Sequence, residues 1–350
     1  MKIVAVLYPG GDAADNPELL GCAENALGLR DFVEERGHEL VSITDREGDE
    51  LRGHLQDAEV LITTPFWPVY VDEAMLDGTP ELKLILTAGV GSDHVDLGAA
   101  AERNITVAEQ TDSNTVSVAE HAVMQVLALV RNYIPAYNDV VNGGWSIGEI
   151  AARSHDLEHK TVGIYGAGRI GQLISLRLKP FDVETLYYKR TRLETTEEST
   201  LGFRYARLEE MLERCDVIVI ASPLTPETRG LFDRENISKM KRGAYIVNIA
   251  RGAIMEKDAV VEALESGQLG GYAGDVWDPQ PAPEDHPWRT MPRHAMTPHI
   301  SGTTLEGQRR YAGDTQLCLE AYFQGEPMEK DHLIVQDGEI VSGSYRAIYG

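Results

Sequence analysis

The sequence predicts a two-domain α/β protein in which each domain is built on a doubly wound parallel sheet. A chain of 350 residues with 43% hydrophobic residues can bury a large core, and chains of this length usually divide into two domains. Short apolar segments of strand length alternate with helix-periodic stretches in two successive series. This alternation is typical of parallel sheets whose faces are covered by helices.

The first series predicts five buried strands and ends in a long helix. The strands are expected at residues 3–7, 40–43, 60–64, 84–87 and 105–108. The helix is expected at residues 117–132, where Ser117 and Glu120 have the spacing of a capping box. Its apolar surface is wider than one stripe, so it lies either inside a large core or against another subunit.

The second series predicts a dinucleotide-binding sheet. Strands are expected at residues 162–165, 185–188, 217–221, 244–249, 271–276 and 295–297. An amphipathic helix is expected at residues 303–323, and the polar tail 331–350 is expected to lie over the surface. We therefore expect residues 115–302 to form a Rossmann domain inserted into a flavodoxin-like domain made of residues 1–114 and 303–350.

Charge and cysteine content exclude several classes of function. The chain carries 32 Lys and Arg residues against 56 Asp and Glu residues, a formal charge of -24, which repels nucleic acids and anionic membrane surfaces. The three cysteines are far apart and have no metal-ligand spacing, so no metal site is expected. The apolar N-terminal segment is too short for a secretion signal, and no apolar run could span a membrane, which favours a cytoplasmic protein.

A glycine motif predicts where a dinucleotide binds. Gly166, Gly168 and Gly171 follow a predicted strand and open a predicted helix with the spacing G-x-G-x-x-G. Glycines at these positions permit a tight turn and a close approach of the pyrophosphate to the helix N-terminus. The sequence context favours dinucleotide binding over an ordinary glycine-rich turn.

Basic residues stand where an NAD-binding domain usually has an acidic one. The next strand ends in Tyr187 and Tyr188, and Lys189 and Arg190 follow. An acidic residue there would bind the ribose 2′-hydroxyl of NAD, whereas two cations could pair with the 2′-phosphate of NADP. We expect NAD or NADP as the cofactor, with NADP accepted through this pair; the alternative is that both cations are solvated surface residues.

The sequence as a whole resembles the NAD-dependent formate dehydrogenases, a branch of the D-2-hydroxyacid dehydrogenase superfamily. The similarity runs from end to end and is carried by specific segments. They include residues 64–68 (TPFWP), 88–94 (AGVGSDH), 113–121 (SNTVSVAEH), 250–253 (ARGA), 274–277 (GDVW), 279–283 (PQPAP), 285–288 (DHPW) and 297–304 (TPHISGTT). The resemblance implies hydride transfer from formate to a nicotinamide cofactor in a homodimeric enzyme.

The substrate residues follow from the superfamily's pattern of an Arg, an acidic residue and a His. The matching positions are Arg251, residue 280 and His299, and residue 280 is Gln. A hydroxy acid must lose its hydroxyl proton as its carbon loses a hydride, which calls for a His base backed by a carboxylate. Formate carries no such proton, so Gln280 favours formate as the substrate.

The resemblance implies further residues of the site. Arg251 would bind the formate carboxylate, Asn114 would donate a second hydrogen bond, and Val90 and Pro68 would line the pocket. The remaining cofactor contacts that the resemblance implies are Thr115, Arg169, Ile170, Pro223, Leu224, Thr225, Pro226, Glu227, Ile249, Asp275, His299, Ile300, Ser301 and Gly302.

Three cofactor positions depart from the family's pattern, and two alternative functions stay open. Lys189 replaces the acidic residue, Thr225 stands where a His is common, and Ile249 stands where a Thr is usual. One alternative is a D-2-hydroxyacid or glyoxylate dehydrogenase of the same fold. The other is a dinucleotide-sensing binding protein, which would need no intact formate site.

Overall fold

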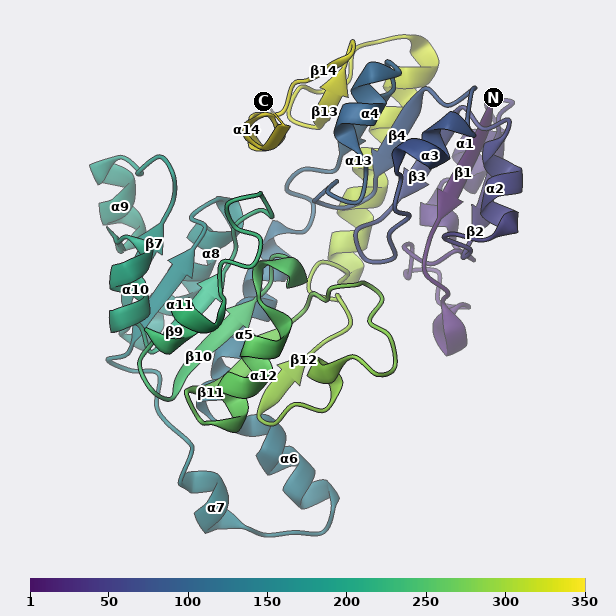
Figure 1. Ribbon diagram of the computed structural model, residues 1–350. Helices are drawn as coiled ribbons and strands as arrows, with labels where there is room; N and C mark the ends of the chain where they lie inside the picture. The colour runs from purple at the N-terminus through teal and green to yellow at the C-terminus, as the bar shows by residue number, and fades with distance from the viewer. Residues whose placement is uncertain (350) are drawn as a thin grey trace. The chain divides into compact units, whose positions relative to one another are not determined.

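The computed structural model describes residues 1–349 and divides into two compact units (Figure 1). Unit 1 contains residues 1–114 and 302–350, and unit 2 contains residues 115–301. The chain returns from unit 2 to unit 1 at Gly302, one residue earlier than the expected boundary at residue 303.

Unit 1 is built on a seven-stranded sheet with the order β14-β13-β5-β4-β3-β1-β2. Its five parallel strands follow the order 2-1-3-4-5 of a flavodoxin-like sheet, as expected. The strands are β1 (Lys2–Val6), β2 (Glu39–Ile43), β3 (Val60–Thr63), β4 (Leu84–Thr87), β5 (Thr106–Glu109), β13 (Leu333–Gln336) and β14 (Glu339–Ile340).

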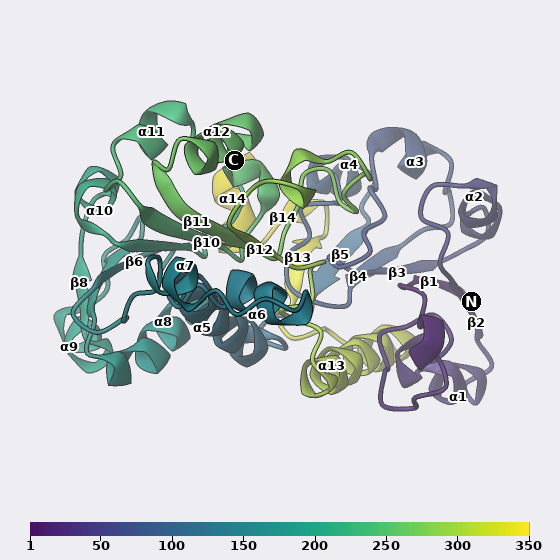
Figure 2. The same ribbon diagram turned by 90° about the horizontal axis from the view of Figure 1, so that it is seen from below.

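Helices cover both faces of this sheet, and each face has its own apolar core. Figure 2 shows α1 and α13 on one face and α3 and α4 on the other. The unit 1 helices are α1 (Arg30–Glu34), α2 (Asp49–Leu55), α3 (Glu73–Asp77), α4 (Leu97–Glu102), α13 (Leu305–Gln324) and α14 (Gly343–Tyr349), with short 3-10 turns at Gly11–Ala13 and Ala26–Gly28.

The expectation that the tail from residue 331 lies loosely over the surface was wrong. Strand β13 pairs antiparallel with β5, and the side chains of Leu333, Ile334 and Val335 are buried. The apolar alternation of this segment is too short to stand out in a polar tail, yet its burial completes the edge of the sheet. The C-terminal segment is therefore part of the unit 1 core.

Unit 2 is built on a parallel seven-stranded sheet with the order β12-β11-β10-β9-β6-β7-β8. This is the Rossmann order 3-2-1-4-5-6 with one further strand, and the switch point lies between β6 and β9. The strands are β6 (Thr161–Tyr165), β7 (Glu184–Tyr188), β8 (Phe203–Tyr205), β9 (Val217–Ile220), β10 (Ala244–Asn248), β11 (Leu269–Gly274) and β12 (His294–Met296). Strand β8 was not predicted, because three residues carry too little periodicity.

The helices of unit 2 also lie on two faces, with α5, α8 and α9 on one and α10, α11 and α12 on the other (Figure 2). They are α5 (Thr115–Val130), α6 (Tyr133–Val141), α7 (Ile147–Ala151), α8 (Arg169–Leu178), α9 (Thr195–Leu201), α10 (Leu208–Arg214), α11 (Arg234–Ser238) and α12 (Lys257–Glu265), with 3-10 turns at Lys179–Phe181, Gly252–Ile254 and Pro287–Arg289. None of the helices described over residues 1–349 has the length and apolar character needed to cross a membrane.

Helix α5 begins two residues earlier than expected, so the predicted capping box was wrong. Ser117 lies inside the first turn and is buried, and Glu120 forms an ion pair with Arg177 of α8 at 3.1 Å. The helix packs against α8 and the sheet, which accounts for most of its apolar surface.

Candidate active site

The glycine turn between β6 and α8 has the geometry that a dinucleotide requires. Gly166 has φ +110°, and a Cβ on it would lie 2.4 Å from the Ser222 backbone nitrogen. A Cβ on Gly171 would lie 2.3 Å from the Gly166 carbonyl oxygen. Gly168, by contrast, faces open space and precedes α8, whose N-terminus has no side-chain cap. The turn therefore leaves backbone N–H groups and room for a pyrophosphate at one place.

The neighbouring strand β9 adds a polar group that the sequence did not single out. The hydroxyl of Ser222 is buried and has no hydrogen-bond partner within the described part of the chain. The Ser222 backbone nitrogen lies against Gly166, so this residue is next to the glycine turn. Its only sequence signal is its position directly after a buried strand beside the switch point.

The loop from Pro223 to Glu227 is held by two threonines. The Thr228 hydroxyl accepts from the Thr225 backbone nitrogen at 2.8 Å, and the Thr225 hydroxyl accepts from the Thr228 nitrogen at 3.2 Å. Thr225 is buried. In this chain Thr225 shapes the loop, and Leu224, Pro226 and Glu227 take their positions from it.

Lys189 and Arg190 follow β7 directly, next to the glycine turn. The Tyr188 carbonyl accepts from the Gly166 nitrogen at 3.0 Å and from the Ala167 nitrogen at 3.2 Å, which ties the two segments together. Lys189 is half-buried and Arg190 is exposed. A hydrogen bond from Thr225 lowers the pKa of Glu227, and the charge of Arg190 lowers it a little more. A carboxylate therefore lies near the cation pair.

The third cation of this segment, Arg192, forms an ion pair within the protein. Arg192 binds Glu198 through two hydrogen bonds of 2.7 and 2.8 Å, and the Tyr187 hydroxyl donates to the same carboxylate at 2.6 Å. The Arg192 guanidinium, followed by the Tyr187 hydroxyl, lowers the pKa of Glu198 to about 2. This network fixes the loop after Arg190 and leaves Lys189 and Arg190 as its two cations for a ligand.

Arg251 lies at the carboxyl end of β10, where the buried Asn248 shapes the turn. The Asn248 side chain donates to the Arg251 carbonyl at 2.9 Å and accepts from the Ala250 nitrogen at 3.1 Å. A Cβ on Gly252 would lie 2.4 Å from the backbone of Trp277. The segment that carries Arg251 is therefore in direct contact with the segment that leads to Gln280.

Gln280 and His299 are brought together as a hydrogen-bonded pair. The Gln280 side-chain amide lies 2.5 Å from Nδ1 of His299, and His299 is buried. Since the amide nitrogen can only donate, Nδ1 accepts and Nε2 carries the proton of the neutral ring. The pair presents a hydrogen-bond donor without a permanent charge.

Asp275 positions the loop that carries His299. Its fully buried carboxylate accepts from the Thr297 hydroxyl at 2.6 Å, the Ile300 nitrogen at 2.8 Å and the Ser301 nitrogen at 2.7 Å. His299 itself has φ +58°, a backbone conformation that needs such support. Asp275, Ile300 and Ser301, which the family resemblance implies as cofactor contacts, are hydrogen-bonded to one another within unit 2.

An aromatic cluster supports the loop on the other side of Gln280. The indole of Trp277 donates to the Thr297 carbonyl at 2.9 Å, and His286 bonds the Asp278 carbonyl through Nε2 at 3.1 Å. The rings of Trp277, His286 and Trp288 contact one another with centroids 5.2 to 6.3 Å apart. These residues lie in segments that carried the family resemblance, and here they act as a scaffold for Gln280.

In unit 1, the loop with Val90 is held close to the segment with Pro68. A Cβ on Gly89 would lie 2.8 Å from the Pro65 ring, and Pro68 is buried at the end of that segment. The Gly91 nitrogen donates to the Glu109 carboxylate at 3.0 Å. Val90 and Pro68 thus come from neighbouring segments of unit 1.

Glu109 and Tyr345 fix this loop, and the sequence analysis missed both. The Tyr345 hydroxyl donates to the Glu109 carboxylate at 3.0 Å and accepts from the Ser92 nitrogen at 2.7 Å. All three residues are buried. The C-terminal helix therefore supports the Val90 loop.

Asn114 ends unit 1 and lies against Gly302, where a Cβ would be 2.6 Å from the Asn114 amide nitrogen. Its amide oxygen is buried and has no hydrogen-bond partner among the described residues. Thr115, Arg169, Ile170 and Ile249 all belong to unit 2, at the start of α5, the first turn of α8 and the end of β10. Each unit thus gathers its own expected site residues around its strand ends.

Comparison with known proteins places the chain in a family. Residues 123–301 match the NAD binding domain of D-isomer specific 2-hydroxyacid dehydrogenases. The chain is 54% identical to the chloroplastic/mitochondrial formate dehydrogenase of Arabidopsis thaliana over 97% of this chain and 89% of that protein. It is 49% identical to the formate dehydrogenase of Pseudomonas sp. (strain 101) over 95% and 86% of the two chains. The chain belongs to the formate dehydrogenase family.

Solved structures of formate dehydrogenases agree with this assignment. The Granulicella enzyme superimposes with a TM-score of 0.94 at 46% identity, covering 97% of this chain and 99% of that one. The NAD-dependent formate dehydrogenase of Staphylococcus aureus, solved in complex with NAD, gives a TM-score of 0.90 at 48% identity, covering 96% and 99%. The predicted fold class and the family resemblance are therefore confirmed.

Proposed function

We propose that this protein oxidises formate to carbon dioxide by passing the formate hydride to NAD⁺. The observation that carries the proposal is the contact between Gln280 and His299. A neutral amide beside the ring keeps His299 a hydrogen-bond donor instead of raising its basicity, and formate oxidation has no substrate proton to remove. A hydroxyacid dehydrogenase would need a carboxylate beside the ring instead, so that the His could act as a base.

The polar side chains then have the task of holding formate. Arg251 would bind the carboxylate, and the Nε2–H of His299 and the Asn114 amide would direct its oxygens. Val90 and Pro68 would provide an apolar wall, which favours a reaction in which a negative and a positive charge disappear. The nicotinamide supplies the hydride acceptor.

The groups around the glycine turn fit a dinucleotide. Gly168 faces open space, the α8 N-terminus is uncapped by a side chain, and the Ser222 hydroxyl is unpartnered. These residues would hold the pyrophosphate, with Lys189 and Arg190 beside the adenine ribose.

We further propose that NADP⁺ is accepted through Lys189 and Arg190. Charge-assisted hydrogen bonds from two cations would bind the 2′-phosphate, and an acidic residue that would repel it is absent from the end of β7 in this sequence. Glu227 works against this, because its carboxylate lies near Arg190. We therefore expect NADP⁺ to be used, but less well than in a variant without the Glu227 charge.

The test is the initial rate of cofactor reduction by formate, measured in parallel with NAD⁺ and NADP⁺. We expect turnover with both; Lys189→Asp should lower kcat/KM for NADP⁺ at least about tenfold, and Glu227→Gln should raise it. Glu213→Gln, an exposed carboxylate on α10, serves as the control. Equal NADP⁺ kinetics in all four proteins would show that the basic pair has no role in cofactor choice.

The same assay separates the alternative functions. Reduction of glyoxylate or pyruvate with NADH at rates above those of formate oxidation would identify a hydroxyacid dehydrogenase. Cofactor binding without turnover of any of these substrates would identify a sensor. Either result would overturn formate oxidation as the function.

We propose that the protein is cytoplasmic.

We also propose that it is a homodimer, formed through α6, α7 and the loop between them. Large apolar side chains are exposed there: Tyr133, Tyr137, Val140, Val141, Trp145 and Ile147, with Trp145 80% exposed. An apolar surface of this kind is typical of an interface. The molar mass from light scattering should be twice 38.6 kDa and should fall to one chain in Trp145→Glu, Val141→Glu; a monomeric wild type would exclude the dimer.

A further inference from the structure

Unit 2 contains a hollow at the amino edge of its sheet, on the side opposite the glycine turn. Its volume is about 250 Å³, and the residues that line it include Gly243 and Gly270, near the starts of β10 and β11. Parallel strands of five residues are roughly 17 Å long, so the hollow lies a strand length away from the pyrophosphate position. It is a separate place on the same unit.

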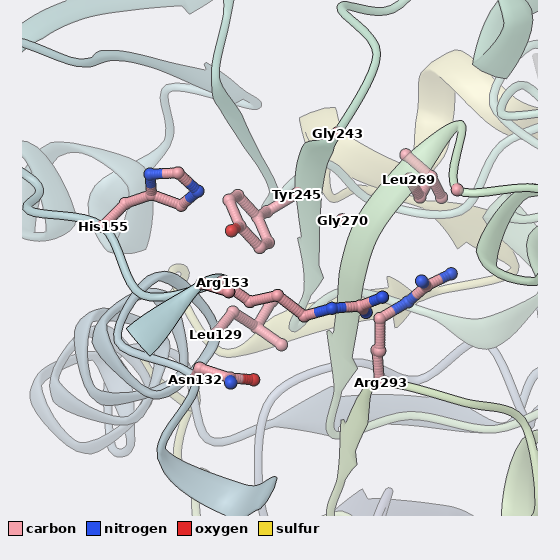
Figure 3. A pocket seen from close by; sticks show the side chains of 11 residues that line it. Leu129, Asn132, Arg153, His155, Gly243, Tyr245, Leu269, Gly270 and Arg293 are labelled. Carbon is pink, nitrogen blue, oxygen red and sulfur yellow. The ribbon is translucent and has the colours of Figure 1, made fainter. Parts of the chain in front are cut away.

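Two arginines line the hollow and lie close together. Figure 3 shows Arg153, in the turn after α7, extending toward Arg293, which precedes β12. Burial, and further the charge of Arg153, lower the pKa of Arg293. Two guanidinium groups in one small hollow repel each other unless an anion lies between them.

Neither arginine has an acidic partner among residues 1–349. The Nε and Nη2 atoms of Arg293 are buried without any hydrogen-bond partner. Arg153 is exposed, so its lack of an acidic partner is unremarkable. The unpartnered atoms of Arg293 are informative in a chain with 56 acidic residues, because buried guanidinium atoms are normally hydrogen-bonded. Neighbouring arginines are paired: Arg131 binds Asp156 at 3.5 Å, and Arg242 donates to the Ser266 carbonyl at 2.9 Å.

The other polar residues of the hollow also suit an anion. Figure 3 shows His155 and Tyr245 facing the hollow from one side and Asn132 from another. No Asp or Glu is among the residues that line it. The imidazole and the hydroxyl can donate, so the lining offers donors and positive charge but no carboxylate.

The backbone holds Arg293 in place at a cost in conformational energy. Arg293 has φ +54°, an uncommon conformation for a residue with a long side chain. Its carbonyl accepts from the Tyr272 nitrogen at 3.2 Å, which fixes this conformation against β11. The guanidinium is thus directed into the hollow by the fold.

We propose that the hollow is a binding site for a small phosphate dianion, free or as the phosphate group of a small metabolite, held between Arg153 and Arg293. Two guanidinium forks suit the several acceptor oxygens of a dianion better than the two of a carboxylate. The site lies outside the formate and cofactor residues, so the proposal does not depend on the proposed reaction.

The first experiment is a calorimetric titration of the full-length protein with inorganic phosphate at constant ionic strength. Saturating NAD⁺ is present so that phosphate cannot bind at the glycine turn. We expect one phosphate per chain, at least about tenfold weaker binding in Arg293→Ala, and no binding in Arg153→Ala, Arg293→Ala. Arg131→Ala, whose guanidinium is already paired, is the matched control and should bind like wild type.

Two further measurements keep the result interpretable. Formate turnover and the thermal unfolding temperature without phosphate establish that each variant is folded, and phosphate should raise that temperature in wild type but not in the double variant. Titration with glucose 6-phosphate distinguishes a phosphate monoester from free phosphate. Equal phosphate binding by wild type and the double variant would overturn the proposal, as would a crystal structure in which an acidic side chain of a second copy fills the hollow.

Discussion

The side-chain amide of Gln280 lies 2.5 Å from Nδ1 of His299. The amide fixes the tautomer and the orientation of the ring, so the Nε2–H points away from Gln280 as a donor. The Asp275 carboxylate holds the following residues, Ile300 and Ser301, through their backbone nitrogens. His299 is therefore oriented from both sides, by an amide at the ring and by a carboxylate under the loop.

Gln280→Glu should impair formate oxidation and change its pH dependence. A carboxylate beside Nδ1 favours the charged imidazolium, and its own charge repels formate. We expect kcat/KM for formate to fall at least about tenfold, or about 1.4 kcal/mol, with the pH profile displaced upward. Gln280→Ala should lower the rate without displacing the profile. Wild-type rates and an unchanged profile in the Glu variant would argue against the role given to this contact.

Alanine at two positions of the glycine turn should have different effects, one on stability and the other on cofactor binding. The Cβ of Gly171→Ala would lie 2.3 Å from the Gly166 carbonyl oxygen, so this variant should unfold at a lower temperature. The Cβ of Gly168→Ala meets nothing within 4 Å, and its φ of −76° suits alanine, so its stability should be unchanged. Only its KM for the cofactor should rise, because the methyl group occupies the space left for the pyrophosphate. Unchanged cofactor kinetics in Gly168→Ala would place the pyrophosphate elsewhere.

Tyr345→Phe should destabilise the protein and weaken formate binding. The change removes a donor to the buried Glu109 carboxylate and the acceptor of the Ser92 nitrogen. Leaving buried polar groups unpaired costs roughly 1–3 kcal/mol of unfolding free energy, measurable by denaturant unfolding. The KM for formate should rise because Val90 lies two residues before Ser92. Glu213→Gln, at an exposed carboxylate of α10, should change neither quantity.

The Glu198 network should contribute stability that depends on pH. Arg192 lowers the folded-state pKa of Glu198 to about 2, below its ordinary value of 4.5. The contribution is therefore complete above about pH 5 and is lost as the pH falls toward about 2. The difference in unfolding free energy between wild type and Glu198→Gln should shrink over this range. A difference that stays constant with pH would contradict the assignment, and Glu213→Gln should show no difference at any pH.

Local patterns in the sequence determined much of this protein. The strands β1 to β5 and the glycine turn were predictable because apolar alternation and glycine spacing are properties of neighbouring residues. Gln280 and His299 were predictable as a pair because the family resemblance and the chemistry of formate pointed to the same positions.

Only the tertiary structure decided which distant residues support the site. Tyr345 bonds to Ser92 across 253 positions of the chain, and its surroundings in the sequence are those of an ordinary polar tail. Likewise, nothing near Arg293 in the sequence indicates that Arg153 lies beside it without an acidic partner. Contacts of this kind arise when packed elements meet, and they depend on the burial and direction of side chains, which the order of residues does not reveal.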